Sequence, residues 1–346
     1  MGFAPGRSWP QPSGMGAHVE FTCLGAWRCG GGKMIEPNRV IGGLIGVAVG
    51  DALGVPVELE PRARRIEDPI CDMRGGGTYG QPPGTWSDDA SLTFCTVEAL
   101  LSQYSTDVLG MMFARWLQEG FWTARGEVFD VGGTTRASIL RILHGIPPEQ
   151  SGSSLESENG NGSLMRIMPI VLANCRWSIP LMLERVHEAS RVTHAHPRSQ
   201  MACGLYALVT RNLLFHRAPG AAYRYAMEGA RNLYLQEPWR DERRNFGRLL
   251  RGTLAEVPER EIGSNGYVVN TLEAAMWSLL TTRNFRDCVL KAVNLGDDAD
   301  TVAAVAGGLA GVAYGIEKIP PEWIDALARK DDLLDAATRF AAMASR

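Results

Sequence analysis

Small residues recur at every fourth position in two apolar segments near opposite ends of the chain. The first segment, residues 38–54, carries Gly42, Gly46, Gly50 and Gly54. The second, residues 302–315, carries Ala303, Gly307, Gly311 and Gly315. In a helix each set lies along one face, and glycine costs about 1 kcal/mol per site in a helix interior. We therefore predict two helices that pack backbone to backbone along these faces.

The same spacing occurs in paired membrane helices, but the lengths of the two runs argue against that alternative. The apolar run at 302–316 is only fifteen residues long, and the run at 40–57 is interrupted by Asp51. Both fall short of the roughly 20 apolar residues that a bilayer span needs. We expect neither a membrane span nor a membrane partner.

Helical periodicity dominates the chain from residue 38 to its end. Apolar side chains recur at intervals of three and four residues, and the alternation typical of strands is nearly absent. The sequence therefore predicts an all-α fold, a single compact multi-helix orthogonal bundle over residues 34–346. Residues 1–33 lack such a pattern and are predicted to be a disordered N-terminal extension.

Charge and cysteine content restrict the partners and the compartment. The net charge is −3, so no overall positive field attracts nucleic acid. The seven cysteines are scattered without a Cys-x-x-Cys pair, which favours free thiols in a reducing cytoplasm over disulfides or a zinc site. We expect a cytoplasmic protein without a nucleic-acid partner. The sequence allows a monomer and does not decide the oligomeric state.

Two apolar helices are preceded by an unusual number of acidic residues. The two starts are Ser87, Asp88 and Asp89 before residues 92–101, and Asp297, Asp298, Asp300 and Thr301 before residues 302–315. One such residue is enough to cap a helix, and at the first start a simple cap at Ser87 explains the pattern as well as a site does. Clustered carboxylates repel one another, however, and a bound cation removes that repulsion. Glu58, just past the first glycine-rich helix, adds a sixth carboxylate. Oxygen donors without His or Cys favour Mg²⁺ or Mn²⁺ over zinc.

A loop rich in Gly, Asn and Ser, residues 159–163, leads into another helix. Free backbone N–H groups at a helix start can bind phosphate. Most such loops are only turns, and this one has neither the Lys of a P-loop nor the G-x-G-x-x-G spacing after a strand. Both interpretations of the loop remain open at this point.

Five motifs, taken in order, resemble those of the ADP-ribosylglycohydrolase family. They are Gly50-Asp-Ala-Leu-Gly-Val-Pro-Val-Glu58, Trp86-Ser-Asp-Asp89, Gly160-Asn-Gly-Ser-Leu-Met-Arg166, Thr193-His194 and Asn294-Leu-Gly-Asp-Asp-Ala-Asp-Thr301. Five ordered matches are far more specific than any single one. The resemblance implies an all-α enzyme with a dinuclear Mg²⁺ or Mn²⁺ centre. Such an enzyme hydrolyses the glycosidic bond between ADP-ribose and a modified protein side chain.

The resemblance also implies a substrate class. The expected partner is an ADP-ribosylated protein or a small ADP-ribosyl compound. Arginine is the expected linkage, with serine and threonine as alternatives.

The resemblance further implies roles for individual residues. Two metal ions are expected at Ser87, Asp88, Asp89, Asp298, Asp300 and Thr301. The substrate is expected at Gly160, Asn161, Gly162, Ser163, Met165, His194 and Tyr267, with residues 130–135 lining the same pocket. Catalysis is expected from Glu58 and Asp300, and which acid transfers the proton stays open. Ser87 replaces the threonine usual in the family and keeps its hydroxyl. Asp297 stands where many members have glycine and is expected to lie outside the metal shell.

Two other functions compete with this interpretation. A catalytically silent relative would bind ADP-ribose or block a toxin as an immunity protein, but every expected hydroxyl and carboxylate is present. A helical metal phosphohydrolase would normally recruit His beside Asp, and the chain contains no His-Asp dipeptide.

Overall fold

The computed structural model describes residues 35–345, so the predicted disordered extension at residues 1–33 lies outside the described residues. Within residues 35–345 the chain forms helices, short 3₁₀ turns and three isolated β-bridges, and no β-strand. The predicted all-α bundle is therefore confirmed.

The α-helices differ widely in length. In chain order they are α1 (Pro37–Gly54), α2 (Arg62–Glu67), α3 (Asp88–Leu101), α4 (Thr106–Glu119), α5 (Gly133–Leu143), α6 (Pro148–Ser151), α7 (Met168–Asn174), α8 (Ile179–Arg191), α9 (Pro197–Leu214), α10 (Pro219–Leu233), α11 (Gly247–Arg251), α12 (Val268–Leu280), α13 (Phe285–Val293), α14 (Ala299–Tyr314), α15 (Pro321–Ala326) and α16 (Lys330–Ala344).

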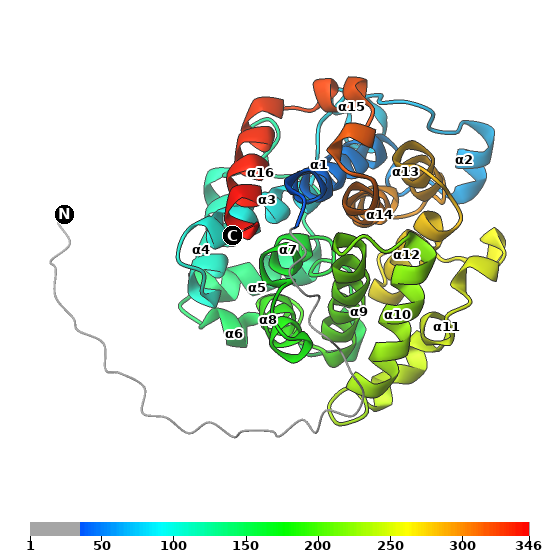
Figure 1. Ribbon diagram of the computed structural model, residues 1–346. Helices are drawn as coiled ribbons and strands as arrows, with labels where there is room; N and C mark the ends of the chain where they lie inside the picture. Colours follow the sequence, from blue (N-terminus) through cyan, green and yellow to red (C-terminus); the bar gives the residue numbers. More distant parts are fainter. Residues whose placement is uncertain (1–34, 346) are drawn as a thin grey trace, which may run out of the picture. The chain divides into compact units, whose positions relative to one another are not determined.

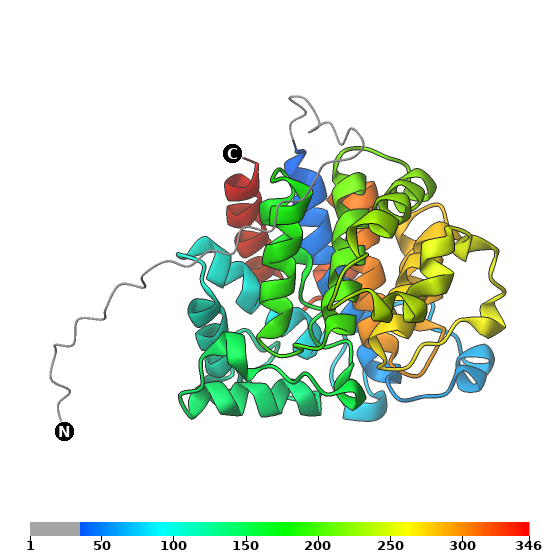
Figure 2. The ribbon, with the colours of Figure 1, turned by 90° about the horizontal axis from the view of Figure 1, so that it is seen from below.

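The glycine-rich helices α1 and α14 lie side by side in the middle of the described helices (Figures 1 and 2). A Cβ atom placed on Gly46 would lie 2.2 Å from the carbonyl oxygen of Gly307, and one placed on Gly307 would lie 2.1 Å from the oxygen of Gly46. The same closeness holds between Gly50 and the Ala303 oxygen, at 2.1 Å. The predicted backbone-to-backbone contact is confirmed.

The order of these contacts shows that the two helices run antiparallel. Gly42 lies against Gly311 at one end of the contact, and Gly54 lies against Asp300 at the other. The C-terminal end of α1 therefore meets the N-terminal end of α14. Other helices cover the pair: α3 and α16 pack on α1, and α12, α13 and α9 pack on α14 (Figure 1).

The segment Pro37–Val57 is long enough to span a bilayer, contrary to the expectation from its sequence. It has the length and hydropathy of a bilayer span, so the expectation that it is too short is wrong. Burial gives a different reason for its apolar character, because 94% of the tested window is buried inside the protein. That burial is typical of the core helix of a globular bundle.

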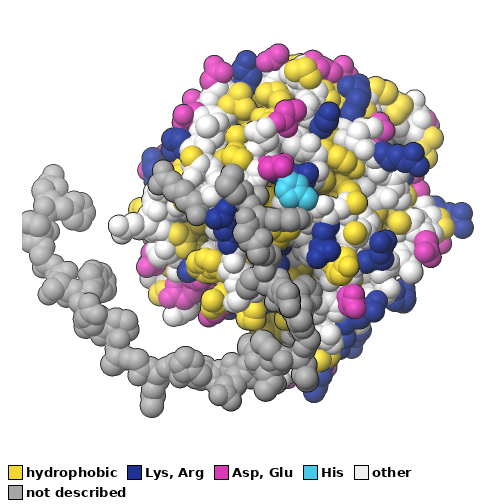
Figure 3. All heavy atoms as spheres, viewed as in Figure 1, with side chains coloured by type: hydrophobic (Ala, Val, Ile, Leu, Met, Phe, Trp, Pro, Cys, Tyr) yellow, Lys and Arg dark blue, Asp and Glu magenta, His cyan; other side chains and the backbone are white. Residues whose placement is uncertain are grey.

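The surface and the thiols are unremarkable. Basic and acidic side chains both appear across the uncovered part of the face in Figure 3, as the small net charge suggests. The five cysteines among the described residues are all free, and only Cys71 is exposed.

Candidate metal centre

The start of α3 is built around Asp51, a buried carboxylate in the last turns of α1. Its two oxygens accept hydrogen bonds from the backbone N–H groups of Ser87 and Ala90, each at 2.8 Å. The Ser87 hydroxyl caps the same helix by accepting from the N–H of Asp89 at 3.3 Å. Ser87, Asp88 and Asp89 are all buried. The cap interpretation of Ser87 is therefore correct, and a cap does not exclude a second role.

Sequence reasoning missed Asp51 as a part of this site. The sequence signal for it is an acid inside an otherwise apolar helix. A fully buried Asp needs hydrogen-bond donors, and here the first turn of α3 supplies them.

The start of α14 is built differently. Asp298 occupies the N-cap position, yet its side chain makes no cap hydrogen bond. Its Oδ2 atom instead accepts from the side-chain amide of Asn161 at 2.8 Å. The Thr301 hydroxyl donates to Asp89 Oδ2 at 3.2 Å, which joins the two acid-rich starts directly.

Asp297 lies outside this hydrogen-bonded group, and its own hydrogen bonds hold the adjacent turns in place. Its carboxylate accepts from the Ser264 hydroxyl at 2.9 Å. Its backbone pairs with the turn after α1, where the N–H of Leu59 donates to the Asp297 oxygen and the N–H of Asp297 donates to the Glu60 oxygen, both at 2.7 Å. This pairing holds Glu58 beside Asp298.

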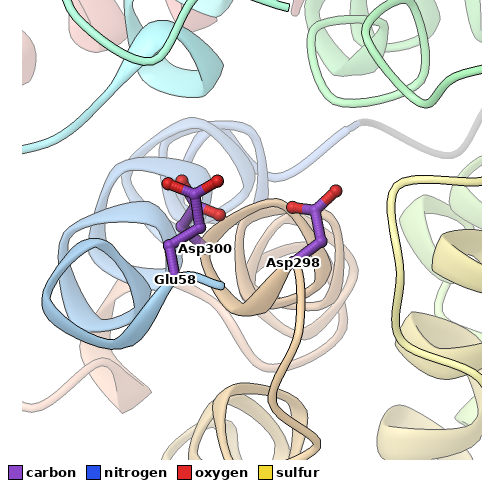
Figure 4. Close-up of side chains that lie close together, drawn as sticks. All are labelled: Glu58, Asp298 and Asp300. Carbon is purple, nitrogen blue, oxygen red and sulfur yellow. The ribbon is translucent and has the colours of Figure 1, made fainter. Parts of the chain in front are cut away.

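Three carboxylates converge at this junction. Oxygen atoms of Glu58, Asp298 and Asp300 all lie within 4.8 Å of one another, and Figure 4 shows the three side chains pointing to the same side of the ribbon. This cluster contains Glu58, which sequence reasoning assigned to catalysis, and does not contain Asp88 or Asp89.

The donors at the junction fit a hard divalent cation. Glu58 Oε2, Asp89 Oδ1 and Asp300 Oδ2 are buried without a hydrogen-bond partner. Buried carboxylate oxygens are strongly disfavoured unless they are paired or coordinate a metal. Carboxylates and hydroxyls are the ligands that Mg²⁺ and Mn²⁺ prefer.

The pKa values of these carboxyls reflect the same unfavourable burial of negative charge. Burial, followed by repulsion from neighbouring acids, raises the pKa of Asp88, Asp89 and Asp300 well above the ordinary value. Burial and the nearby Asp130 raise the pKa of Glu58 to about 8, and burial raises that of Asp51 to about 7. A cation at the site would favour the ionised forms instead.

A cavity of about 260 Å³ opens above the cluster. Its walls are Glu58, Asp88, Asp130, Gly132, Gly133, Thr134, Thr135, Gly160, Asn161, Gly162, Met165, His194, Gly266, Asp298 and Thr301. The acidic residues thus share one cavity with the glycine-rich loop. The expected pocket segment, residues 130–135, contributes five of the lining residues and includes the first turn of α5.

Several predicted residues do not line this cavity. Ser87, Asp89 and Asp300 lie buried behind the lining residues. The Ser163 hydroxyl accepts from Ser190 at 2.9 Å and is fully buried. Tyr267 stands at the N-cap of α12, half-buried, and forms a β-bridge with Gly160. Sequence position alone does not reveal which way these side chains point.

The fold and the site define the class of protein: an all-α protein whose buried carboxylates and glycine-rich loop share one cavity. A family model described as ADP-ribosylglycohydrolase matches residues 34–346. The chain belongs to this family and is an ADP-ribosyl glycohydrolase.

Named relatives cover nearly the same part of the chain. The ADP-ribosylarginine hydrolase Tri1 of Serratia proteamaculans is 33% identical over 89% of this chain and 80% of its own length. The ADP-ribosyl-[dinitrogen reductase] glycohydrolase of Rhodospirillum rubrum is 30% identical over 85% of this chain and 91% of its own length. A solved structure titled ADP-ribosylglycohydrolase-related protein complex is 32% identical with a TM-score of 0.75, covering 89% of this chain and 98% of the other.

Proposed function

We propose that the protein uses divalent cations to hydrolyse the bond between ADP-ribose and an arginine side chain of a modified protein. The observation that carries the proposal is the set of unpartnered carboxylate oxygens on Glu58, Asp89 and Asp300 beside the cavity. The linkage is inferred from relatives that are named for ADP-ribosylarginine.

Two Mg²⁺ or Mn²⁺ ions would be held by residues from both acid-rich helix starts. The holding residues are Ser87, Asp88, Asp89, Asp298, Asp300 and Thr301. Bound cations would supply Lewis-acid chemistry and neutralise the charge of the acids. The hydrogen bond from Thr301 to Asp89 keeps the two halves of this set in register.

The loop at residues 160–162 and the first turn of α5 would bind the diphosphate of ADP-ribose. Backbone N–H groups in the first turn of α5 are free to donate to phosphate oxygens, whereas the loop supplies a close backbone surface. The loop is held rigidly, because the N–H of Asn161 donates to the Gly266 oxygen at 3.1 Å and the Asn161 side chain donates to Asp298. Met165 and His194 complete this wall of the cavity.

Glu58 is the group we assign to proton transfer, with Asp300 beside it. Hydrolysis adds water across the C–N bond, so the departing guanidine takes up a proton while the attacking water loses one. A group that does this works best with a pKa near the working pH. Burial raises the pKa of Glu58 to about 8, and the charge of nearby cations would lower it toward neutrality.

The test is an ADP-ribose release assay on arginine-, serine- and threonine-linked substrates, with Mg²⁺ and Mn²⁺ titrated after chelation. We expect release from the arginine-linked substrate only when cation is added. Release in the presence of chelator would reject the cation requirement, and preference for serine would reject the linkage. Binding of ADP-ribose without release from any substrate would favour the catalytically silent alternative.

A further inference from the structure

Three buried side chains form a chain of contacts that ends at the cavity wall. Arg166 Nη2 donates to the Thr193 hydroxyl oxygen at 2.7 Å. The same oxygen lies 2.9 Å from Nδ1 of His194. Arg166, Thr193 and His194 are each at most 2% exposed. Their hydrogen-bond roles are therefore decided by one another and not by water.

Arg166 sets the direction of these hydrogen bonds because a guanidinium can only donate. The Thr193 oxygen accepts the Arg166 proton, so its own hydrogen is left to be donated. Among the described residues, the partner available to that hydroxyl is Nδ1 of His194. If Nδ1 donated instead, the buried Thr193 hydrogen would have no acceptor, at a cost of about 1–3 kcal/mol. Nδ1 is therefore the acceptor.

A neutral imidazole that accepts at Nδ1 carries its proton on Nε2. Burial, together with nearby Arg166, lowers the pKa of His194 to about 3, so the ring is neutral at physiological pH. A Cβ placed on Gly162 would lie 3.4 Å from Nε2, which puts that edge of the ring against the glycine-rich loop. Nε2 makes no hydrogen bond within the described residues, and His194 lines the cavity.

Arg166 has few other contacts that could draw its guanidinium away from Thr193. It also donates to the Ala189 oxygen at 3.2 Å, and its guanidinium carbon lies 4.5 Å from the centre of the Phe113 ring. No carboxylate pairs with it among the described residues, and its Nε and Nη1 atoms have no hydrogen-bond partner. Burial lowers its pKa only to about 10, so it stays charged and remains a donor.

We infer that Arg166 and Thr193 are positioning residues that hold His194 as the Nε2–H tautomer, so that a neutral donor faces an acceptor oxygen of the ligand in the cavity. The inference rests on the proposed function only for the identity of that ligand, ADP-ribose. A neutral donor binds an oxygen of a phosphate or a sugar without placing a positive charge in the buried wall of the cavity. Neither Arg166 nor Thr193 lines the cavity, so both act through His194.

The test is ¹⁵N–¹H NMR of the histidine rings, which distinguishes a protonated ring nitrogen from an unprotonated one. A His194→Gln variant identifies the His194 signals among those of the six histidines. In the ligand-free protein we expect the proton on Nε2. We expect Thr193→Ser to preserve that state and Thr193→Val to let a measurable minor fraction of the rings carry the proton on Nδ1, because Nδ1 then loses its hydrogen-bond donor. A proton on Nδ1 in the wild type, or an unchanged tautomer in Thr193→Val, overturns the inference.

Thr210→Val is the matched control for Thr193→Val. Thr210 is fully buried in α9, its hydroxyl has no hydrogen-bond partner, and it lies about 20 Å along the helix from the start of α9. We expect this variant to leave the His194 signals unchanged. Loss of the Nε2–H state in Thr210→Val as well would show a general packing effect and would overturn the inference.

Calorimetric titration with ADP-ribose and Mg²⁺ tests the consequence for binding. We expect Thr193→Val to bind more weakly in proportion to its loss of the Nε2–H fraction, with about tenfold, the size of one hydrogen bond to a charged ligand, as the upper bound, and Thr193→Ser and Thr210→Val to bind as the wild type does. Equal affinity in all variants would reject the donor role. If the wild type failed to bind ADP-ribose, the proposed function would fail, whereas the tautomer result, obtained without ligand, would still stand.

Discussion

The contact between α1 and α14 has two regions with opposite physical character. Along most of its length, glycines let two backbones touch, and nearly everything is apolar and buried. At one end the same two helices bring together Glu58, Asp298 and Asp300, whose charges repel and whose oxygens are partly unpartnered. The first region stabilises the fold without help, whereas the second is costly until something positive binds. The comparison indicates that rigid packing is what holds a strained site in place.

The largest effect is expected from a single methyl group in the glycine contact. Gly46→Ala places a Cβ about 2.2 Å from a carbonyl oxygen that belongs to a backbone and cannot turn aside. We expect a loss of at least ~3 kcal/mol of unfolding free energy, the upper end of overpacking costs, measured by urea denaturation. Gly247→Ala is the control, because nothing lies within 4 Å of its added Cβ. Equal losses in the two variants would show that helix packing does not set the stability.

The acidic end should respond to cations and to loss of one carboxylate. Saturating Mg²⁺ or Mn²⁺ should stabilise the chelator-treated protein, by about 2.7 kcal/mol at a cation concentration of 100 times Kd. Asp300→Asn should abolish most of this gain in a thermal melt, since one buried ligand is neutralised. In the absence of cation the same variant should be no less stable than the wild type, because a repelling charge is removed.

Asp241→Asn is the matched control for Asp300→Asn, since Asp241 is a largely exposed carboxylate at the start of the 3₁₀ helix Asp241–Phe246. It should keep the full response to cation. If both variants lost the response, a general charge effect would explain it and the assigned site would be wrong.

The dependence of folding stability on pH should also distinguish the acidic end from the glycine-packed region. The folded-state pKa values of Glu58 and Asp51 are raised, to about 8 and about 7, so the folded protein binds more protons than the unfolded chain above pH ~4. The stability from these groups is full at low pH and is lost as the pH rises through those values. Cation-free protein should therefore lose at least ~2 kcal/mol between pH 5 and 8, measured by denaturation in chelator. Saturating cation should remove this slope, and a cation-free protein that gains stability over the range would contradict the prediction.

The smallest effect is expected at a helix cap. Ser87→Ala and Ser105→Ala each remove an N-cap hydroxyl, the first at α3 and the second at α4, and each should cost about 1 kcal/mol without cation. Only Ser87→Ala should also weaken the stabilisation by Mg²⁺, measured as the shift in Tm on adding cation. If the two variants responded alike to cation, Ser87 would be a cap and nothing more.

The sequence predicted the packing region better than the site. The four-residue spacing of glycines specifies both helices and the faces that meet, because only close approach justifies so many glycines. The acid-rich starts were visible as well, but their partners were not. The hydrogen bond from Thr301 to Asp89 joins positions 212 apart, and no local pattern encodes it. Asp51 was overlooked because its two donors belong to another helix. The partner of the Ser163 hydroxyl, Ser190, also lies outside its local sequence, 27 positions away.

The repeating contact between α1 and α14 does not by itself determine how the two helices are aligned along their axes. A pattern with a period of four residues fits almost as well when one helix slides by a turn, about 5.4 Å, along the other. Such a misaligned chain would keep most of its glycine contacts yet separate Glu58 from Asp300. The backbone pairing of Asp297 with Leu59 and Glu60 exists only in one alignment. This pairing therefore stabilises the alignment in which Glu58 lies near Asp300, relative to a shifted alignment that would be well packed but inactive.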